Sequence, residues 1–424
     1  MSKARKLKRI AIIGGGPSGL FMYKRLIESN QEFEITIFEK KQKLGIGMPY
    51  GDKGANLEHI TNVSENEIPT LVTSIEEWSK TLTPEYLNKF NIDPNHFNEY
   101  KVLPRLFFGE YLAAQFQLLI ENAEDTDQTT KLYLNTEVID VLDQPKLKET
   151  WIELADHTIL KFDYIIICTG HNWPKTFEGT VKGYYDSPYP PSKLKLKLNH
   201  SVAIKGSSLT AIDAIRTLAR NNGKFSRDSH GYLVYELDQE VQNFKIIMHS
   251  RSGLLPAVRF HLEDSHLKNE NLLTEEEIKN HRSQNDGFVS LDYIFEKNFK
   301  MQFITKDLSF YEKIKDLDLE NFVDLMMEQR EKISPFQLLK AEYIEAEKSI
   351  KRQQSIYWKE LLGSLSFTLN YPAKYFSAED MMRLQKVLMP LISIIIAYLP
   401  QGSCEELLAL HSVGVLDLVN VDED

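Results

Sequence analysis

Three glycines near the amino terminus have the spacing of a turn that holds the phosphates of a dinucleotide. Gly14 permits a tight turn after a strand, a side chain at Gly16 would keep a pyrophosphate from the backbone, and Gly19 lets the next helix pack closely. The N-terminus of that helix presents unpaired N–H groups and a partial positive charge to phosphates. We predict that this turn binds a dinucleotide through Gly14, Gly16, Pro17, Ser18 and Gly19.

An acidic residue stands where such a turn needs a partner for the ribose. Glu39, followed by Lys40, ends the next strand-like run 25 residues after Gly14, close to the roughly 20 residues typical of dinucleotide folds. A carboxylate there can accept hydrogen bonds from the ribose 2′- and 3′-hydroxyl groups. A glycine-rich turn in an α/β protein that binds no nucleotide is the alternative. Strand, turn, helix and acid together favour a nucleotide, either NAD or FAD.

A second turn of the same kind follows later in the chain. The segment Gly206-Ser207-Ser208-Leu209-Thr210-Ala211 again joins a strand to a helix. Ser208 and Ala211 replace the second and third glycines, and both are small, so a phosphate can still approach the backbone. We predict that Gly206, Ser207, Ser208 and Thr210 line a second nucleotide site.

The residues that end the next strand indicate which nucleotide the second turn binds. That strand ends in His249-Ser250-Arg251, where a ribose-binding acid would stand in an NAD site. Serine and arginine suit a 2′-phosphate, because arginine forms paired, charge-assisted hydrogen bonds to phosphate. NADPH is therefore favoured over NADH at Ser250 and Arg251. The alternative is that Arg251 caps a surface loop.

An apolar strand between the two turns favours FAD in the first site. The run from Asp163 to Cys168 is followed directly by Thr169-Gly170. These small residues would lie beside a dinucleotide at the carboxyl edge of the sheet. Because a second nucleotide site follows this strand, we expect FAD in the first turn and contacts to it from Thr169 and Gly170.

The elements that must position these residues follow from hydrophobic periodicity. Residues 9–39 are predicted to form strand, turn, helix and strand, and an antiparallel meander precedes a final strand. The same pattern restarts at Val202, and helical periodicity dominates from Glu275 to Leu410. The predicted fold class is α/β, with two Rossmann-like dinucleotide-binding domains and a mainly helical C-terminal region. We predict an FAD-binding domain at 1–185, an NAD(P)H-binding domain at 198–265 and the helical region at 266–424.

Composition excludes several classes of function. The net charge of −11, with no long run of lysine and arginine, argues against broad nucleic-acid binding. Cys168 and Cys404 are the only cysteines, so we expect no disulfide framework, no dithiol mechanism and a cytoplasmic location. The apolar stretch Val387 to Leu399 falls short of the ~18 residues of a membrane span and is predicted to be a buried helix. The histidines lack metal-ligand spacing, so no metal site is expected.

The paired turns, the Thr169-Gly170 strand end and the Ser250-Arg251 pair resemble the two-dinucleotide flavoprotein oxidoreductases. These include flavin monooxygenases and N-hydroxylating monooxygenases. The chain is also similar to the bacterial FAD-NAD(P)-binding protein family in five further segments. They are Gly45 to Gly51, Leu57 to Val63, Pro104 to Leu112, the hairpin Gly223 to Tyr235, and Ser250 to Pro256.

This resemblance implies roles for five residues outside the two turns. Gly47, Met48 and Asn62 would lie near the flavin. Arg105 would lie near the FAD phosphates or ribose, and Val138 would contact the adenine through its backbone.

The end of the chain departs from the family pattern. Related flavoproteins often return to the FAD domain with a strand and a helix that faces the flavin, whereas Leu407 to Val421 offers at most a short strand at Val413 to Val419. Either the helical region replaces that contact, or the chain is truncated, or FAD is held loosely.

Two hypotheses about function follow. The leading one is an FAD-dependent oxidoreductase that accepts hydride from NADPH, closer to a monooxygenase than to a dehydrogenase, with a small-molecule substrate. The cofactor carries the difficult chemistry, so no catalytic side chain is assigned. The alternative is a non-catalytic FAD/NAD(P)-binding protein whose helical region, residues 266–424, binds a protein partner.

Overall fold

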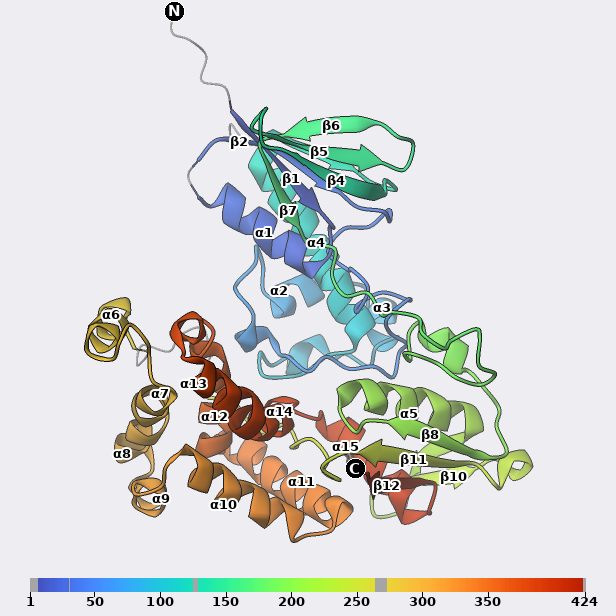
Figure 1. Cartoon of the computed structure of the whole chain (residues 1–424). Helices are drawn as coiled ribbons and strands as arrows, with labels where there is room; N and C mark the ends of the chain where they lie inside the picture. The colour runs from blue at the N-terminus through green and yellow to red at the C-terminus, as the bar shows by residue number, and fades with distance from the viewer. Residues whose placement is uncertain (1–6, 30, 125–128, 264–272, 422–424) are drawn as a thin grey trace, which may run out of the picture. The chain divides into compact units, whose positions relative to one another are not determined.

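The chain divides into two compact units in the computed structural model, which describes residues 7–29, 31–124, 129–263 and 273–421 (Figure 1). The first unit comprises Met1–Thr61 and Thr70–Lys193, and the second comprises Asn62–Pro69 and Leu194–Asp424. The short segment 62–69 therefore belongs to the second unit, although residues of the first unit flank it in the sequence. The chain passes between the units three times.

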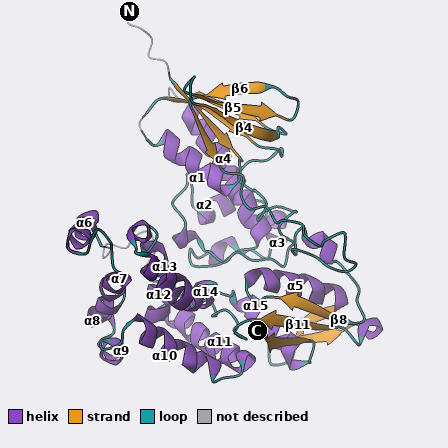
Figure 2. Ribbon diagram, viewed as in Figure 1, coloured by secondary structure: helices purple, strands orange, loops and turns teal. Residues whose placement is uncertain are grey.

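A parallel four-stranded sheet forms the centre of the first unit, in the order β3-β2-β1-β7. Figure 2 draws the strands of this unit in orange. Each strand is short, and β1 pairs with β2 on one side and with β7 on the other. The strands are β1 (Lys8–Ile13), β2 (Phe33–Phe38), β3 (Thr129–Tyr133) and β7 (Tyr164–Ile167).

The helices α1 and α4 cover one face of this sheet and an antiparallel meander covers the other, while α2 and α3 lie away from the sheet (Figure 1). Ala11 and Ile13 of β1 pack in one buried cluster with Ile152 and Phe162 of the meander. Both faces of β1 are therefore buried, which explains its continuous apolar run. The helices are α1 (Pro17–Ile27), α2 (Ile75–Ser79), α3 (Pro84–Asn88) and α4 (Arg105–Glu124), and the meander strands are β4 (Val138–Gln144), β5 (Glu149–Leu154) and β6 (Ile159–Phe162).

The second unit opens with another strand–turn–helix–strand arrangement. Its three-stranded parallel sheet has the order β12-β11-β8. The strand β12, near the carboxyl end of the chain, pairs with β11 and so completes this sheet. The elements are β8 (Ser201–Lys205), α5 (Leu209–Asn222), the hairpin β9 (Gly223–Arg227) and β10 (Leu233–Leu237), β11 (Lys245–Ser250), α15 (Gln401–Ser412) and β12 (Leu416–Asn420).

Helices dominate the chain from 275 to 412, and the predicted α/β class with a helical C-terminal region is confirmed. A separate cluster of buried apolar residues joins these helices. The stretch Val387 to Leu399 contains the helix α14 and is largely buried, as predicted. The remaining helices are α6 (Glu275–Gln284), α7 (Leu291–Asn298), α8 (Phe303–Lys306), α9 (Leu308–Ile314), α10 (Leu319–Glu331), α11 (Pro335–Arg352), α12 (Tyr357–Thr368), α13 (Ala378–Arg383) and α14 (Met389–Ile396). Among the described residues, none of the helices has the length and apolar character needed to cross a membrane.

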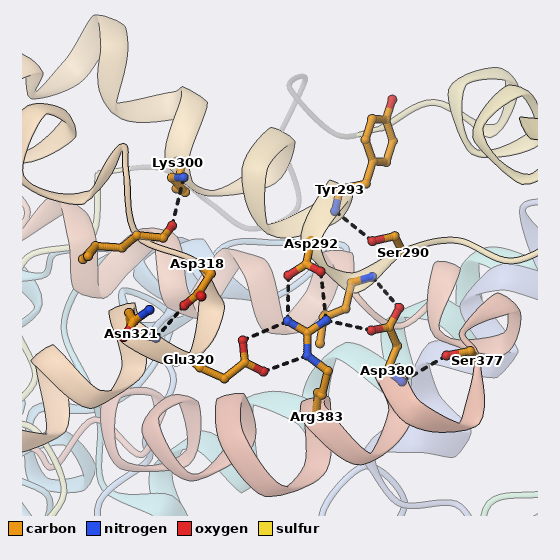
Figure 3. Close-up of polar contacts among 12 residues, drawn as sticks. Ser290, Asp292, Tyr293, Lys300, Asp318, Glu320, Asn321, Ser377, Asp380 and Arg383 are labelled. Atoms are coloured by element: carbon orange, nitrogen blue, oxygen red, sulfur yellow. Dashed lines mark hydrogen bonds and ion pairs between the residues drawn. The ribbon is translucent and has the colours of Figure 1, made fainter. Parts of the chain in front are cut away.

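One arginine ties three of these helices together (Figure 3). The Arg383 guanidinium donates hydrogen bonds to Glu320 of α10 at 2.7 and 2.9 Å. It also binds Asp292 of α7 at 2.7 and 2.9 Å and Asp380, within its own helix α13, at 2.9 Å. Asp380 in turn accepts a hydrogen bond from the backbone N–H of Leu291 at 3.0 Å. Three carboxylates thus converge on one positive charge.

An Arg383→Met variant is expected to destabilise the protein. The change leaves three neighbouring carboxylates without their shared cation, and hydrogen bonds to charged groups are each worth about 1.5–3 kcal/mol. We expect the free energy of unfolding, measured by urea denaturation, to fall by about 2 kcal/mol. Lys332→Met is the control, because its pair with Glu328 is exposed and should contribute less than about 1 kcal/mol. Equal effects of the two changes would contradict this role of Arg383.

A buried ion-pair network joins α5 to α15. Glu406 accepts hydrogen bonds from Arg216 at 2.8 and 2.9 Å and from Arg220 at 2.9 and 2.7 Å. Burial by itself would raise the pKa of Glu406, but the hydrogen bonds from Arg220 and Arg216 outweigh it and lower the pKa to about 2.

This low pKa predicts acid sensitivity. The folded protein keeps Glu406 ionised down to about pH 2, whereas the ordinary pKa of a glutamate is 4.5. As the pH falls, the unfolded chain therefore takes up this proton at a higher pH than the folded protein does. The stabilisation is therefore complete above about pH 4.5 and is lost as the pH falls towards 2, by about 3 kcal/mol in all. Denaturation of wild type and Glu406→Gln at several pH values measures this, and the difference between them should shrink over that window. A difference independent of pH would exclude the assignment.

Candidate cofactor-binding sites

Gly14 begins the first turn in a conformation that favours glycine. Its φ is +103°, and its N–H donates a hydrogen bond to the carbonyl oxygen of Phe38, at the end of β2, at 2.8 Å. A Cβ atom at this position would lie 2.3 Å from the carbonyl oxygen of Cys168. The turn is therefore held between the ends of β2 and β7, where a side chain has no room.

Gly16 and Gly19 allow two further close approaches. A Cβ on Gly19 would lie 2.1 Å from the carbonyl oxygen of Gly14, so this glycine lets α1 begin directly over the turn. A Cβ on Gly16 would lie 3.1 Å from the Cα of Gly47. The loop that contains Gly47 therefore lies against the turn.

The N-terminus of α1 is left without a side-chain cap. Gly16 is its N-cap residue, Pro17 occupies the first turn, and no acidic residue lies there. Several other helices are capped by a serine, threonine or aspartate side chain, as Ser74 caps α2 and Asp318 caps α10. The first N–H groups of α1, including those of Ser18 and Gly19, have no partner within the helix. They are suited to an anion such as a pyrophosphate.

Glu39 supports this turn from the end of β2. Its side chain is buried, with 8% of the residue exposed. One carboxylate oxygen accepts a hydrogen bond from the N–H of Gly15 and the other from the N–H of Lys41, both at 2.9 Å. Each carboxylate oxygen has a second lone pair that can accept a bond from a ribose hydroxyl group. The neighbouring Lys40 is exposed.

Gly45 and Gly109, to which the family resemblance assigns no role, fix the loop Gly45 to Gly51. The N–H of Gly45 donates to the carbonyl oxygen of Gly15 at 2.7 Å, and a Cβ on Gly45 would lie 2.7 Å from the backbone of α4. A Cβ on Gly109 of α4 would lie 2.3 Å from the carbonyl oxygen of Tyr50. The loop that carries Gly47 and Met48 is thus packed between the turn and α4. In the sequence, the only sign of this close contact was a glycine, Gly109, within the apolar run of α4.

Arg105 and Asn62 lie in different units. Arg105 starts α4 and donates from Nε to the carbonyl oxygen of Ile60 at 3.0 Å, while its N–H donates to His59 at 2.9 Å. The segment that begins at Asn62 belongs to the second unit. The carbonyl oxygen of Asn62 accepts a hydrogen bond from Arg259 at 2.7 Å. The roles that the resemblance implies for both residues stay predictions.

The remaining predicted residues of the first site lie after the end of β7 and at the start of β4. Thr169 and Gly170 follow β7 and are exposed, next to Gly14. The segment before Val138 is anchored to the end of β2, because the N–H of Thr136 donates to the carbonyl oxygen of Glu39 at 3.0 Å. The structure therefore brings Gly14, Glu39 and Thr169 together at one sheet edge.

The second turn repeats the backbone geometry of the first. Gly206 also has a φ of +103°, and its N–H donates to the carbonyl oxygen of His249, near the end of β11, at 2.7 Å. Here a Cβ would meet nothing within 4 Å. Ser208 is the N-cap of α5 and makes no side-chain cap, and no acid lies in that first turn, which also contains Thr210. The side chain of Ser207 donates to the carbonyl oxygen of Leu254 at 2.7 Å.

The strand registers place Ser250 where Glu39 stands in the first unit. Ile13 pairs with Phe38 just before Gly14 and Glu39, and Lys205 pairs with His249 just before Gly206 and Ser250. Ser250 is buried, and the following Arg251, which corresponds to Lys40, is exposed. A serine and an arginine thus replace the carboxylate at the second site.

Parts of the chain are similar to proteins of known sequence or structure. The chain is 26% identical to the uncharacterized protein YdhS of Escherichia coli K12 over 426 residues, which is 99% of this chain and 78% of that protein. It is 28% identical to a thiol-specific monooxygenase of Saccharomyces cerevisiae over 174 residues, 39% of this chain and 34% of the yeast protein. A structure of cyclohexanone monooxygenase from Rhodococcus sp. Phi1 bound to NADP+ matches with a TM-score of 0.32 at 10% identity, over 67% of this chain and 44% of its own. The chain therefore spans less than half the length of either monooxygenase.

Two family models match separate parts of the chain. One, described as FAD-NAD(P)-binding, matches residues 11–172, and the other, described as the YdhS-like middle domain, matches residues 274–396. The first match spans the turn at Gly14, Glu39 and the strand end at Thr169. It confirms the predicted family resemblance, with FAD and NAD(P) as the cofactors of that family. Residues 11–172 are therefore similar to the FAD-NAD(P)-binding family, and residues 274–396 are similar to the YdhS-like middle domain family.

Proposed function

We propose that this chain is a flavin-dependent oxidoreductase that holds FAD in the first unit, binds NADPH in the second and acts as a monooxygenase on a small molecule. The observation that carries the proposal is the repeated turn. Gly14 and Gly206 share their φ and the hydrogen bond to the neighbouring strand, but the residue at the corresponding register position of this strand end is Glu39 in one unit and Ser250 in the other. Two such sites with different ribose partners fit two different dinucleotides.

The first site has the groups that FAD requires. The uncapped N-terminus of α1 would bind the pyrophosphate, and glycines at Gly14 and Gly16 leave the backbone accessible to it. Glu39, already fixed by two backbone N–H groups, would orient the ribose. The packed loop with Gly47 and Met48 would then form a rigid wall beside the flavin end of the cofactor.

The second site has the charge that NADPH requires. Arg251 and the hydroxyl group of Ser250 would bind the 2′-phosphate, and the absence of a carboxylate at position 250 removes the group that would repel it. The uncapped start of α5, behind Gly206 and Ser208, would bind the pyrophosphate.

When both cofactors are bound, NADPH supplies a hydride to FAD and the reduced flavin can pass the electrons to oxygen. The side chains of the chain would act by binding each cofactor and orienting it within its own unit. Part of this chain is similar to a thiol-specific monooxygenase of yeast. This similarity supports oxygen, and not another molecule, as the electron acceptor in the proposal.

Anaerobic reduction tests the proposal. The full chain is saturated with FAD, freed of excess cofactor, and mixed with NADPH or NADH without oxygen. We expect a bound-flavin absorbance band that bleaches faster with NADPH and returns on admission of oxygen. A protein that retains no flavin, or whose flavin neither coenzyme reduces, would disprove the proposal.

A non-catalytic nucleotide-binding protein is the second candidate. The pairing of β12 with β11 favours it. Related flavoproteins often return a strand and a helix to the FAD domain, whereas β12 joins the second sheet among the described residues. This candidate predicts that FAD and NADP+ both bind while NADPH leaves the flavin oxidised, so the same experiment separates the two.

A further inference from the structure

A buried, non-helical segment, residues 253–260, follows β11 and contacts both the second turn and the segment 62–69. It starts directly after Arg251 and Ser252, and all of its residues are buried. Its backbone is held at several points. The N–H of Ala257 donates to the carbonyl oxygen of Ile394, and its carbonyl oxygen accepts from the N–H of Leu399. The N–H of Arg259 donates to the carbonyl oxygen of Leu399 at 2.9 Å. These hydrogen bonds pair backbone groups that would be costly to leave without a partner in the interior.

Arg259, near the end of this segment, binds 62–69 with both terminal nitrogens of its guanidinium group. One terminal nitrogen donates to the carbonyl oxygen of Asn62 at 2.7 Å. The other donates to the hydroxyl oxygen of Ser64 at 2.7 Å and binds the carboxylate of Glu67. Ser64 and Glu67 also form a capping box with each other. The side chains of Arg259 and Glu67 are only 6% and 7% exposed, so these bonds are formed away from water and are costly to break.

The other end of the buried segment is attached to the second turn. The Ser207 hydroxyl group donates to the carbonyl oxygen of Leu254 at 2.7 Å. A continuous series of contacts therefore leads from Ser207 through residues 254–259 to Asn62. At Thr61 the chain passes covalently into the first unit, close in sequence to Ile60, which binds Arg105.

We propose that Arg259 is a positioning residue that couples occupancy of the second nucleotide turn to the placement of Asn62. The proposal rests on the proposed function, in which the second turn binds NADPH, and on the role near the flavin that the family resemblance implies for Asn62. Ligand binding at the turn restrains Ser207 and the buried segment, and Arg259 passes that restraint to 62–69. Lysine cannot replace it, because a single ammonium group cannot span the three oxygen atoms that the planar guanidinium contacts together.

Hydrogen exchange on the full chain with bound FAD tests the coupling without turnover, with NADP+ as the probe. In wild type we expect NADP+ to slow amide exchange in 62–69 by about fivefold or more, the range of ordinary coupling energies. In Arg259→Lys this protection should disappear. Arg330→Lys is the matched control, because Arg330 is equally buried in a pair with Glu342, at 6% and 7% exposure, but does not contact 62–69. The control should keep the protection.

Flavin reduction provides a second readout. When Arg259→Lys is saturated with FAD, we expect NADPH to reduce its flavin roughly tenfold to a hundredfold more slowly than in wild type, because Asn62 is misplaced. Glu67→Gln, which keeps Arg259 in place, should show a smaller change in the same direction. NADP+ binding to wild type without any change in 62–69, or normal reduction of Arg259→Lys, would overturn the coupling and leave the proposed function intact. Failure of NADPH to reduce the wild-type flavin would instead overturn the proposed function.

Discussion

A Gly14→Ala variant is expected to purify without FAD. The added methyl group would lie 2.3 Å from the carbonyl oxygen of Cys168, and the φ of +103° disfavours any side chain. Relief of this clash must move either the turn or the end of β7, and both form the proposed pyrophosphate site. We expect at least about 3 kcal/mol of lost binding free energy, or roughly a hundredfold in FAD affinity. Flavin absorbance per protein after purification, followed by titration with FAD, measures the loss.

Gly206→Ala is the matched control for this variant. Gly206 has the same φ, but a Cβ atom there meets nothing within 4 Å. The substitution therefore adds backbone strain of about 1–2 kcal/mol without a clash. FAD content should stay at the wild-type level, while the affinity for NADP+ falls modestly. Equal loss of FAD in both variants would mean that the effect reflects general unfolding, and the assignment of FAD to the first turn would fail.

The two turns could be predicted from the sequence because each is local. Strand, turn and helix are contiguous around Gly14 and around Gly206, and the alternation of apolar residues identifies the strands that flank them. Glu39 and Ser250 lie at the end of the next strand in each case, so their positions follow from the same short pattern. The fold class and the helical C-terminal region follow from periodicity in the same way.

The contacts that connect distant parts of the chain could not be predicted. Arg259 lies 197 residues from Asn62, and Arg216 lies 190 residues from Glu406, so no spacing rule relates them. A short apolar strand was predicted near the carboxyl end, but its pairing with β11 depends on which edge is open in the folded sheet. The membership of 62–69 in the second unit likewise depends on a buried arginine that the sequence shows only as one of many charged residues.

The nucleotide preference of the second site can be tested where the two units differ. Position 250 corresponds in register to Glu39, and a carboxylate there would accept hydrogen bonds from ribose hydroxyl groups and repel a 2′-phosphate. The carbonyl oxygen of Ser250 accepts a hydrogen bond from the N–H of Val421 at 3.0 Å, so the backbone at this position is held independently of the side chain. A substitution here should therefore change the ligand contacts more than the fold.

A Ser250→Glu variant is expected to reverse the coenzyme preference. Like charges placed together at a binding site cost several kcal/mol, so kcat/KM for flavin reduction by NADPH should fall about a hundredfold, while that for NADH should stay level or rise. Arg251→Ala should lower the NADPH value by about tenfold without gain for NADH. Ser252→Glu adds the same charge two residues further along, outside the register position, and should leave the ratio of the two coenzymes within about threefold of wild type. If Ser252→Glu shifts the ratio as strongly as Ser250→Glu, the preference reflects the overall charge of this loop, and the parallel between Ser250 and Glu39 does not hold.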